Sequence, residues 1–103
     1  MSSSLLIDRG DLSRYIPIEE IPLAQDMIIQ NAKKFKTPVF VATNLLETMV
    51  TQKSPTRAES NDIYSTLKQG AKGLVLAAET AIGSYPLDCI KFLRKCIKIY
   101  KKN

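Results

Sequence analysis

The chain has 103 residues and a mass of 11.5 kDa, of which 45% are hydrophobic and 24% charged. This is the composition of an ordinary globular protein, and the length suits one small domain, which we expect over residues 1–103. No apolar run approaches the roughly 20 residues of a membrane-spanning helix. The first residues lack the basic and then apolar profile of a secretory signal. We therefore expect a cytoplasmic protein without a membrane span.

The net charge of +5 is confined to the end of the chain. Residues 1–87 contain nine basic and nine acidic residues, whereas residues 88–103 contain six basic residues and one acidic residue. Apolar residues recur at helical spacing among these basic residues, which predicts an amphipathic helix. We expect this helix to pack on the domain with its basic side in water, and we expect neither a membrane nor a nucleic acid as partner. The alternative is binding to an anionic surface such as phosphates or lipid head groups.

The two cysteines do not indicate a disulfide or a metal site. Cys89 and Cys96 are seven residues apart on the predicted helix, about 10 Å along its axis, which is too far for a disulfide bond. The chain has no histidine and no second cysteine cluster, which argues against zinc and excludes a nucleophile that needs an imidazole base. We expect two reduced structural thiols in a reducing compartment.

Three short apolar runs predict strands, over Leu5–Ile7, Val39–Ala42 and Leu74–Ala77. Each run is continuous rather than alternating, which is typical of parallel strands covered on both faces. Between the first two runs, apolar residues at helical spacing from Ala24 to Phe35 end among lysines and predict the first long helix. A short helix is expected over residues 44–49, directly after the second run.

The second long helix and the tail helix have clear start and stop signals. Thr56 and Glu59 have the spacing of a capping box, which marks a helix start, and Gly70 marks the end of the same helix. Pro86 is well placed as the first residue of the tail helix. The predicted order is therefore strand, helix, strand, helix, strand, helix.

Right-handed crossovers would make these three strands parallel, which fits part of a doubly wound sheet or part of a (β/α)₈ barrel. Polar residues follow each strand, and they are Arg9, Gly10 and Asp11 after the first, Thr43 after the second, and Glu79 and Thr80 after the third. The carboxyl edge of a parallel sheet is where α/β proteins build their sites. Turn and cap residues of any loop between a strand and a helix would give the same pattern.

Taken together, these loops resemble one known family. The segments that carry the likeness are Arg9–Leu12 (RGDL), Pro22–Gln25 (PLAQ), Ala42–Met49 (ATNLLETM), Pro55–Glu59 (PTRAE) and Glu79–Pro86 (ETAIGSYP). In order and spacing they resemble the last three βα units of the pyruvate kinase barrel, over nearly the whole chain. The resemblance implies an α/β fold of three βα units with parallel strands, a partial TIM (β/α)₈ barrel that forms a single partial domain over residues 1–103.

The resemblance also implies a reaction, in which phosphoenolpyruvate gives its phosphoryl group to ADP with the help of Mg²⁺ and K⁺. It implies that Arg9, Gly10 and Asp11 belong to the substrate site, with the backbone amides of Gly10 and Asp11 on the substrate carboxylate. The Asp11 carboxylate would ligate Mg²⁺, and Thr43 would be the catalytic residue beside the carbon that is protonated. Helix amino ends suit anions and carboxylates suit a hard divalent ion, so these roles are physically reasonable. The K⁺ ligands are not expected in this chain.

The resemblance gives three other residues a structural role. Arg57, Glu59 and Glu79 match motifs concerned with loop structure and subunit contacts, so we do not expect them to be catalytic.

The chain departs from the family pattern at positions that carry chemistry. Ala77 and Ala78 stand where the family commonly has Ser-Gly, which removes a hydroxyl associated with proton delivery. Ile82 stands where a lysine near the nucleotide phosphates is common. The further departures are Asp8, Ser13 and Asn44. Each lost charge contact in a dry site typically costs about 10² to 10³ in rate, so several together would silence an enzyme.

The family's phosphoryl-binding lysine and the glutamate that shares the metal are expected before Met1, so we expect the isolated chain to be inactive. Three strands cannot close a barrel, so a bare sheet face is expected. The candidate residues for it are some of Leu5, Ile7, Val39, Val41, Leu74 and Leu76. We expect the chain to self-associate, to cover this face with a relocated helix, or to be part of a longer chain. The alternative function is a non-catalytic structural or interaction module.

Overall fold

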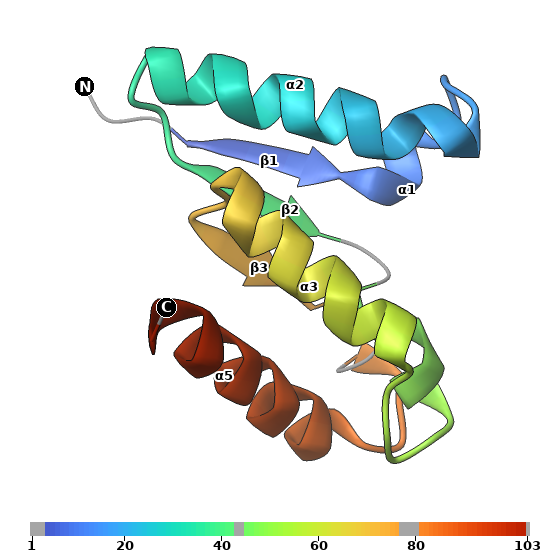
Figure 1. The fold of residues 1–103 in the computed structure, drawn as a ribbon. Helices are drawn as coiled ribbons and strands as arrows, with labels where there is room; N and C mark the ends of the chain where they lie inside the picture. The colour runs from blue at the N-terminus through green and yellow to red at the C-terminus, as the bar shows by residue number, and fades with distance from the viewer. Residues whose placement is uncertain (1–3, 43–44, 77–80, 103) are drawn as a thin grey trace.

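The computed structural model describes residues 4–42, 45–76 and 81–102 (Figure 1). In chain order its elements are β1 (Leu5–Asp8), α1 (Arg9–Leu12), the 3₁₀ helix η1 (Ile18–Glu20), α2 (Ile21–Lys34), β2 (Val39–Ala42), the 3₁₀ helix η2 (Glu47–Val50), α3 (Arg57–Gln69), β3 (Gly73–Val75) and α5 (Pro86–Lys102). The three predicted strands and three long helices are confirmed. The short helix after β2 is a 3₁₀ helix that begins at Glu47, and α1 and η1 were not predicted.

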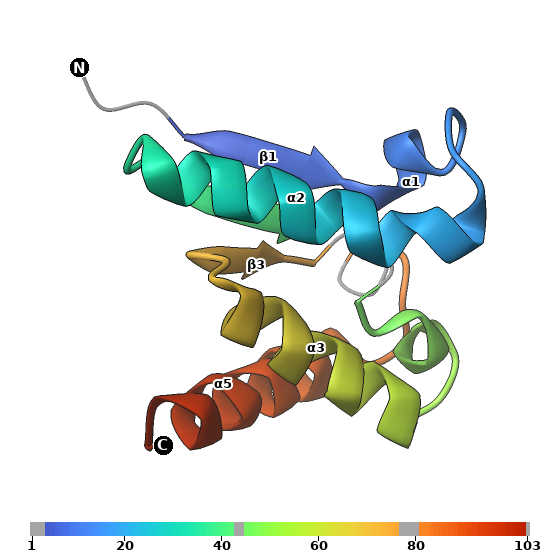
Figure 2. The same ribbon diagram turned by 45° about the horizontal axis from the view of Figure 1, so that its top comes forward.

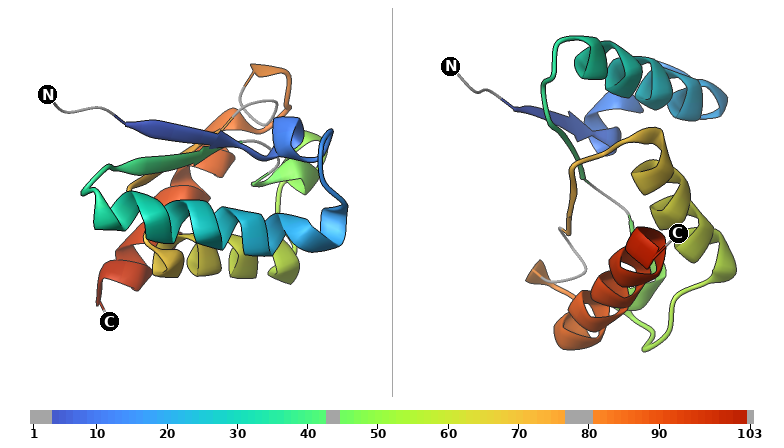
Figure 3. Two further views of the ribbon diagram at one scale, coloured as in Figure 1. Left: turned by 90° about the horizontal axis from the view of Figure 1, so that it is seen from above. Right: turned by 60° about the vertical axis from the view of Figure 1, so that its left-hand side comes forward.

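The strands form one parallel sheet in the order β1-β2-β3. Two views show that α2 and α3 lie on the same side of this sheet and that α5 continues the row beside α3 (Figures 2 and 3). A sequential strand order with right-handed crossovers places every helix on one face, whereas a doubly wound sheet has helices on both faces. The arrangement is therefore that of a barrel segment, the second of the two architectures left open by the sequence.

Two apolar clusters form the core between the sheet and the helices. The cluster under α2 contains Ile7, Ile29, Ala32, Val39, Val41 and Ala71. The cluster between η2, α3 and α5 contains Leu46, Met49, Ile63, Leu67 and Cys89. Leu74 of β3 packs against both clusters, so the third strand joins them into one layer.

Neither Cys89 nor Cys96 is in a disulfide bond, as the spacing of the two residues predicts. Cys89 is fully buried in the second cluster, and Cys96 is half-buried two helical turns further along α5. Burial raises the pKa of the Cys96 thiol, and a hydrogen bond with Ser60 partly opposes this effect. The thiol of Cys96 therefore stays protonated at neutral pH and behaves as a packing group.

Of the six strand residues named as candidates for the bare face, three are instead buried on the helix side. Ile7, Val39 and Val41 are at most 4% exposed, because they point toward the helices. The open face instead carries Leu6, which is 61% exposed, and Val75, which is 41% exposed. Alternate residues of a strand point to opposite faces. When every residue of a strand is apolar, the sequence does not indicate which alternate positions face the helices.

On this open face a glycine and an aromatic ring are paired. Phe40 and Gly73 are partners in the register of β2 and β3. A Cβ atom added at Gly73 would lie 2.7 Å from two ring carbons of Phe40. The ring therefore occupies the space that a side chain at Gly73 would need. None of the three long helices covers this face (Figure 3), so a relocated helix, one of the three alternatives expected from the sequence, is not found in the described residues.

Candidate functional site

The three strands end at a common edge. Asp8, Ala42 and Val75 are neighbours in the register of the sheet, since Asp8 pairs with Ala42 and Ala42 with Val75. The chain therefore leaves all three strands at the same edge, as the sequence predicts. Thr43 and Glu79, which follow β2 and β3 closely, lie outside the described residues, as do Asn44, Ala77, Ala78 and Thr80.

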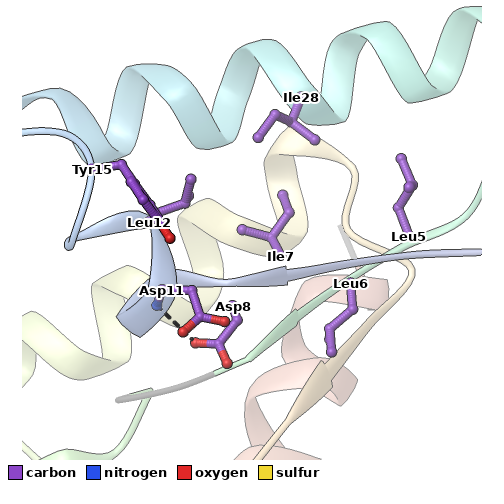
Figure 4. A pocket seen from close by; sticks show the side chains of 8 residues that line it. All are labelled: Leu5, Leu6, Ile7, Asp8, Asp11, Leu12, Tyr15 and Ile28. Carbon is purple, nitrogen blue, oxygen red and sulfur yellow. Dashed lines mark hydrogen bonds between the residues drawn. The ribbon is translucent and has the colours of Figure 1, made fainter.

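The turn after β1 is organised by the carboxylate of Asp8. Asp8 is the N-cap of α1, and its Oδ1 accepts hydrogen bonds from the backbone N–H of Gly10 at 3.0 Å and of Asp11 at 3.3 Å. Aspartate is among the best N-cap residues because it satisfies amides that have no partner inside the helix. The two amides assigned by resemblance to a substrate carboxylate are thus bonded to a carboxylate of the chain itself, and Figure 4 shows Asp8 and Asp11 side by side in this turn.

Arg9 makes an ion pair rather than pointing freely to the strand edge. Its Nη1 lies 2.8 Å from Oδ1 of Asp62 in α3, and the two side chains are 15% and 34% exposed. Because both are partly desolvated, the pair is held more firmly than a surface ion pair. Asp62 was not singled out in the sequence. It lies 53 residues from Arg9, so no local pattern could have linked the two.

Asp11 lies at the rim of a groove beside β1. Its side chain is 64% exposed, and its nearest cation is Arg14, with 3.9 Å between Oδ1 and Nη1. Mg²⁺ keeps its waters tightly and needs several oxygen ligands in octahedral geometry. No group of three or more histidine, cysteine, aspartate or glutamate side chains in the described part of the chain could hold a metal ion. The described residues alone therefore do not fit a complete Mg²⁺ site.

The groove has a volume of about 380 Å³ and is mainly apolar (Figure 4). Its lining residues are Leu5, Leu6, Ile7, Asp8, Asp11, Leu12, Tyr15 and Ile28. It runs between α2 and β1, which is an edge strand of the sheet. Two carboxylates lie near one end of the groove and aliphatic side chains line the rest, so it suits an apolar packing partner better than a small anion.

Glu59 acts within the chain at the start of α3. Its Oε1 accepts a hydrogen bond from the backbone N–H of Thr56 at 2.9 Å, and the N–H of Glu59 donates to Oγ1 of Thr56 at 3.1 Å. These two bonds form the predicted capping box. The other oxygen, Oε2, accepts from the N–H of Thr48 at 2.8 Å. Arg57, the first residue of α3, is exposed.

The surface lacks a cation at one position where the resembled family commonly has one. Ile82, which stands where the resembled family commonly has lysine, is 77% exposed. Among the residues that the structure describes, no helix is long and apolar enough to cross a membrane.

Comparison with known proteins identifies the family. The model for the pyruvate kinase barrel domain matches residues 1–90. Pyruvate kinase from Thermotoga maritima is 46% identical over 102 residues, which cover 99% of this chain and 22% of that protein. The chloroplastic pyruvate kinase isozyme G of Nicotiana tabacum is 45% identical over 92 residues, 89% of this chain and 16% of that protein. Pyruvate kinase from Mycobacterium tuberculosis is 38% identical over 100 residues, 97% of this chain and 21% of that protein.

The chain thus spans about a fifth of the length of the curated relatives it matches. The region matched by the family model contains the parallel sheet, α2, α3, the turn after β1 and the first turn of α5. The chain therefore belongs to the pyruvate kinase family, as a segment of its barrel domain.

Proposed function

We propose that this segment supplies one part of a site for phosphoryl transfer from phosphoenolpyruvate to ADP within a complete barrel, and that it does not turn over by itself. The common edge formed by the ends of β1, β2 and β3 supports the first half of the proposal. In the complete site Gly10 and Asp11 would face the substrate carboxylate, Asp11 would contribute to the Mg²⁺ site, and Thr43 would lie beside the carbon that is protonated. Arg57, Glu59 and Glu79 would stabilise loops and contribute to contacts between subunits.

The observation that carries the second half is the hydrogen bonding of Asp8. Its carboxylate takes both amides of the turn, so an incoming carboxylate would have to displace an anion that is already in place. Like charges at such close range also repel. Arg9, the nearest cation of the turn, is paired with Asp62. Phosphoryl transfer depends on positioned positive charge. Among the described residues after β1, Arg9 is paired with Asp62 and Arg14 lies beside Asp11.

Metals and location belong to the same proposal. Mg²⁺ and K⁺, which the resemblance implies, would need ligands beyond the described residues, and the remainder of a longer chain or another subunit would supply them. We propose the cytoplasm as the location, a reducing compartment that suits two thiols outside any disulfide bond.

The direct test is a coupled assay for pyruvate formation by the isolated segment, with phosphoenolpyruvate, ADP, Mg²⁺ and K⁺ at saturating concentrations. We expect no turnover above the rate without protein. Pyruvate formation that scales with the concentration of the segment would overturn the proposal of inactivity.

A chimaera tests whether the edge still belongs to a working site. The matching stretch of the Thermotoga maritima enzyme is replaced by this segment, since the two are 46% identical over 102 residues. We expect a folded enzyme with a rate lower by at least about 10². Asp8→Ala in the chimaera is expected to lower KM for phosphoenolpyruvate, and Asp26→Ala, at a half-buried aspartate on α2, serves as the matched control. An unchanged KM after Asp8→Ala would show that the Asp8 carboxylate does not compete with phosphoenolpyruvate for the amides of Gly10 and Asp11.

The second candidate function is a structural or interaction module. It is favoured by the exposed Leu6 and Val75 on the open sheet face and by the apolar groove beside the β1 edge. An unpaired strand edge next to exposed apolar side chains favours association. Sedimentation velocity over a range of concentrations separates this candidate from the first, because it requires an associated species at micromolar concentration. A monomer at every concentration would exclude self-association.

A further inference from the structure

The outer side of α5 carries an uncompensated positive surface. The surface consists of the six basic residues of the helix, which are Lys91, Arg94, Lys95, Lys98, Lys101 and Lys102, and we call it the basic face. All six are exposed. Because successive helical residues are about 100° apart, the six occupy an arc of about 120° centred opposite the buried Cys89. They extend about 16 Å along the axis, at 1.5 Å per residue.

The basic face has no internal acidic partner that accounts for it. Both ion pairs found among the described residues lie elsewhere, at Arg9 with Asp62 and at Arg14 with Asp11. The only acidic residue of α5 is Asp88 in its first turn. Since residues 1–87 are neutral, the net charge of +5 is concentrated on this one helix.

The charge pattern works against the helix itself. Lys98 has basic neighbours three or four residues away in both directions, at Arg94, Lys95, Lys101 and Lys102. Like charges at these spacings destabilise a helix. A solvated face would be more stable with charges of both signs, so the uniform sign favours a role in binding an anionic partner.

The chemistry around the basic face favours a lipid surface over a nucleic acid. Leu87 and Ile99, 69% and 60% exposed, accompany the basic residues along the helix, and such side chains can enter a head-group layer. The aromatic residues of α5 point the other way: Tyr100 stacks edge-on against Tyr64 at 5.8 Å between ring centroids, and Phe92 packs against the core. No aromatic ring of α5 is therefore available to stack on bases, as single-stranded nucleic acid binding requires.

The surface beside the helix adds to the same charge. A shallow hollow of about 260 Å³ places Lys53 next to Lys91 and Lys95, with Asp88 as its one acidic lining residue. A second hollow of about 370 Å³ is lined by four basic residues of the helix and Ile97. The flank of the molecule is thus broad enough to lie along a plane rather than to surround a single small ion.

We propose that the basic face docks the protein on membranes that contain anionic lipids. The lysine stems lie along the surface with their ammonium groups among the lipid phosphates, while Leu87 and Ile99 enter the interfacial layer. This association is peripheral and electrostatic. It needs no membrane-spanning helix and does not depend on the phosphoryl-transfer proposal.

The test is co-sedimentation of the protein with vesicles of phosphatidylcholine that contain about one third phosphatidylserine, and with vesicles of phosphatidylcholine alone. We expect binding to the first kind only, weakening as salt is raised. The double variant Lys95→Glu/Lys98→Glu is expected to bind at least about 25-fold more weakly, on the basis of about fivefold for each basic residue lost. It creates favourable charge pairs on α5, so its folding is not compromised.

The matched control is Lys34→Glu/Lys68→Glu, which makes the same change in net charge on exposed positions of α2 and α3. Binding of this variant should stay close to that of the unchanged protein. Equal loss in the two double variants would overturn the proposal, because it would make net charge alone responsible. So would failure of the unchanged protein to bind anionic vesicles, or tighter binding to duplex DNA than to those vesicles at the same salt concentration.

Discussion

Replacing Asp8 with alanine removes the acceptor that organises the turn after β1. The carboxylate accepts two hydrogen bonds, at 3.0 Å from the N–H of Gly10 and at 3.3 Å from the N–H of Asp11. Loss of an N-cap costs about 0.5–2 kcal/mol. One of the two bonds is partly buried and the longer one is exposed, which places the expected loss near the middle of that range, at about 1 kcal/mol. For a domain of this length, such a loss lowers Tm by about 4–8 °C.

Two companion variants separate the parts of this effect. Asp8→Asn keeps an oxygen that can accept the same bonds and removes only the charge, so it should cost less than Asp8→Ala. Asp26→Ala removes a half-buried aspartate whose Oδ1 accepts a hydrogen bond from Nε2 of Gln30, and it should change stability by less than about 0.5 kcal/mol.

Urea denaturation followed by far-ultraviolet circular dichroism measures the three variants under identical conditions. The expected order of stability is Asp26→Ala, then Asp8→Asn, then Asp8→Ala. If Asp8→Ala is as stable as the unchanged protein, the carboxylate does not cap α1. The argument that it occupies the two amides then fails with it.

Three further predictions concern the sheet, the ion pair and α5. Gly73→Ala should cost about 1–3 kcal/mol, because its Cβ would meet the ring of Phe40; the cost should shrink in a Phe40→Leu background, and equal costs in both backgrounds would contradict it. A double-mutant cycle of Arg9→Met and Asp62→Asn should give a coupling of about 0.5–3 kcal/mol by denaturation, whereas additive effects would mean that the pair contributes nothing. Burial raises the pKa of the Cys96 thiol, so the unfolded chain loses that proton first as pH rises, and the stability contributed by the neutral thiol falls in the alkaline range. Cys96→Ala should therefore show a weaker alkaline loss in denaturation curves, and parallel pH profiles would refute this assignment.

Local signals were enough to predict the elements that obey short-range rules. The capping box of Thr56 and Glu59 and the glycine at the end of α3 act within a few residues, and the structure has both. The same kind of rule applies to Asp8, but the turn it caps is only four residues long and contains a glycine, so no helical periodicity marks it. α1 could have been found only by recognising aspartate as a cap.

Features that depend on distant residues could not be predicted. The pairing of Arg9 with Asp62 joins positions 53 residues apart, and neither partner has a local pattern that indicates the other. The faces of the strands were assigned wrongly because runs such as Val39–Ala42 are apolar at every position. Their orientation is decided by the helices that pack on them, which only the assembled fold reveals. The continuous parallel strands and their shared edge, by contrast, followed from the order of the elements alone.

The two oxygens of Glu59 are used by different segments, one by the start of α3 and the other by the backbone of Thr48 in η2. A single carboxylate thereby joins Thr48 and Thr56, and the segment between these two residues forms a closed loop at the start of α3. The loop therefore closes in the same step that nucleates the helix, so the entropic costs of the two events fall on one transition. Fraying of the first turn of α3 must therefore release the loop as well, so that hydrogen exchange in the two segments should report one cooperative opening rather than two independent ones.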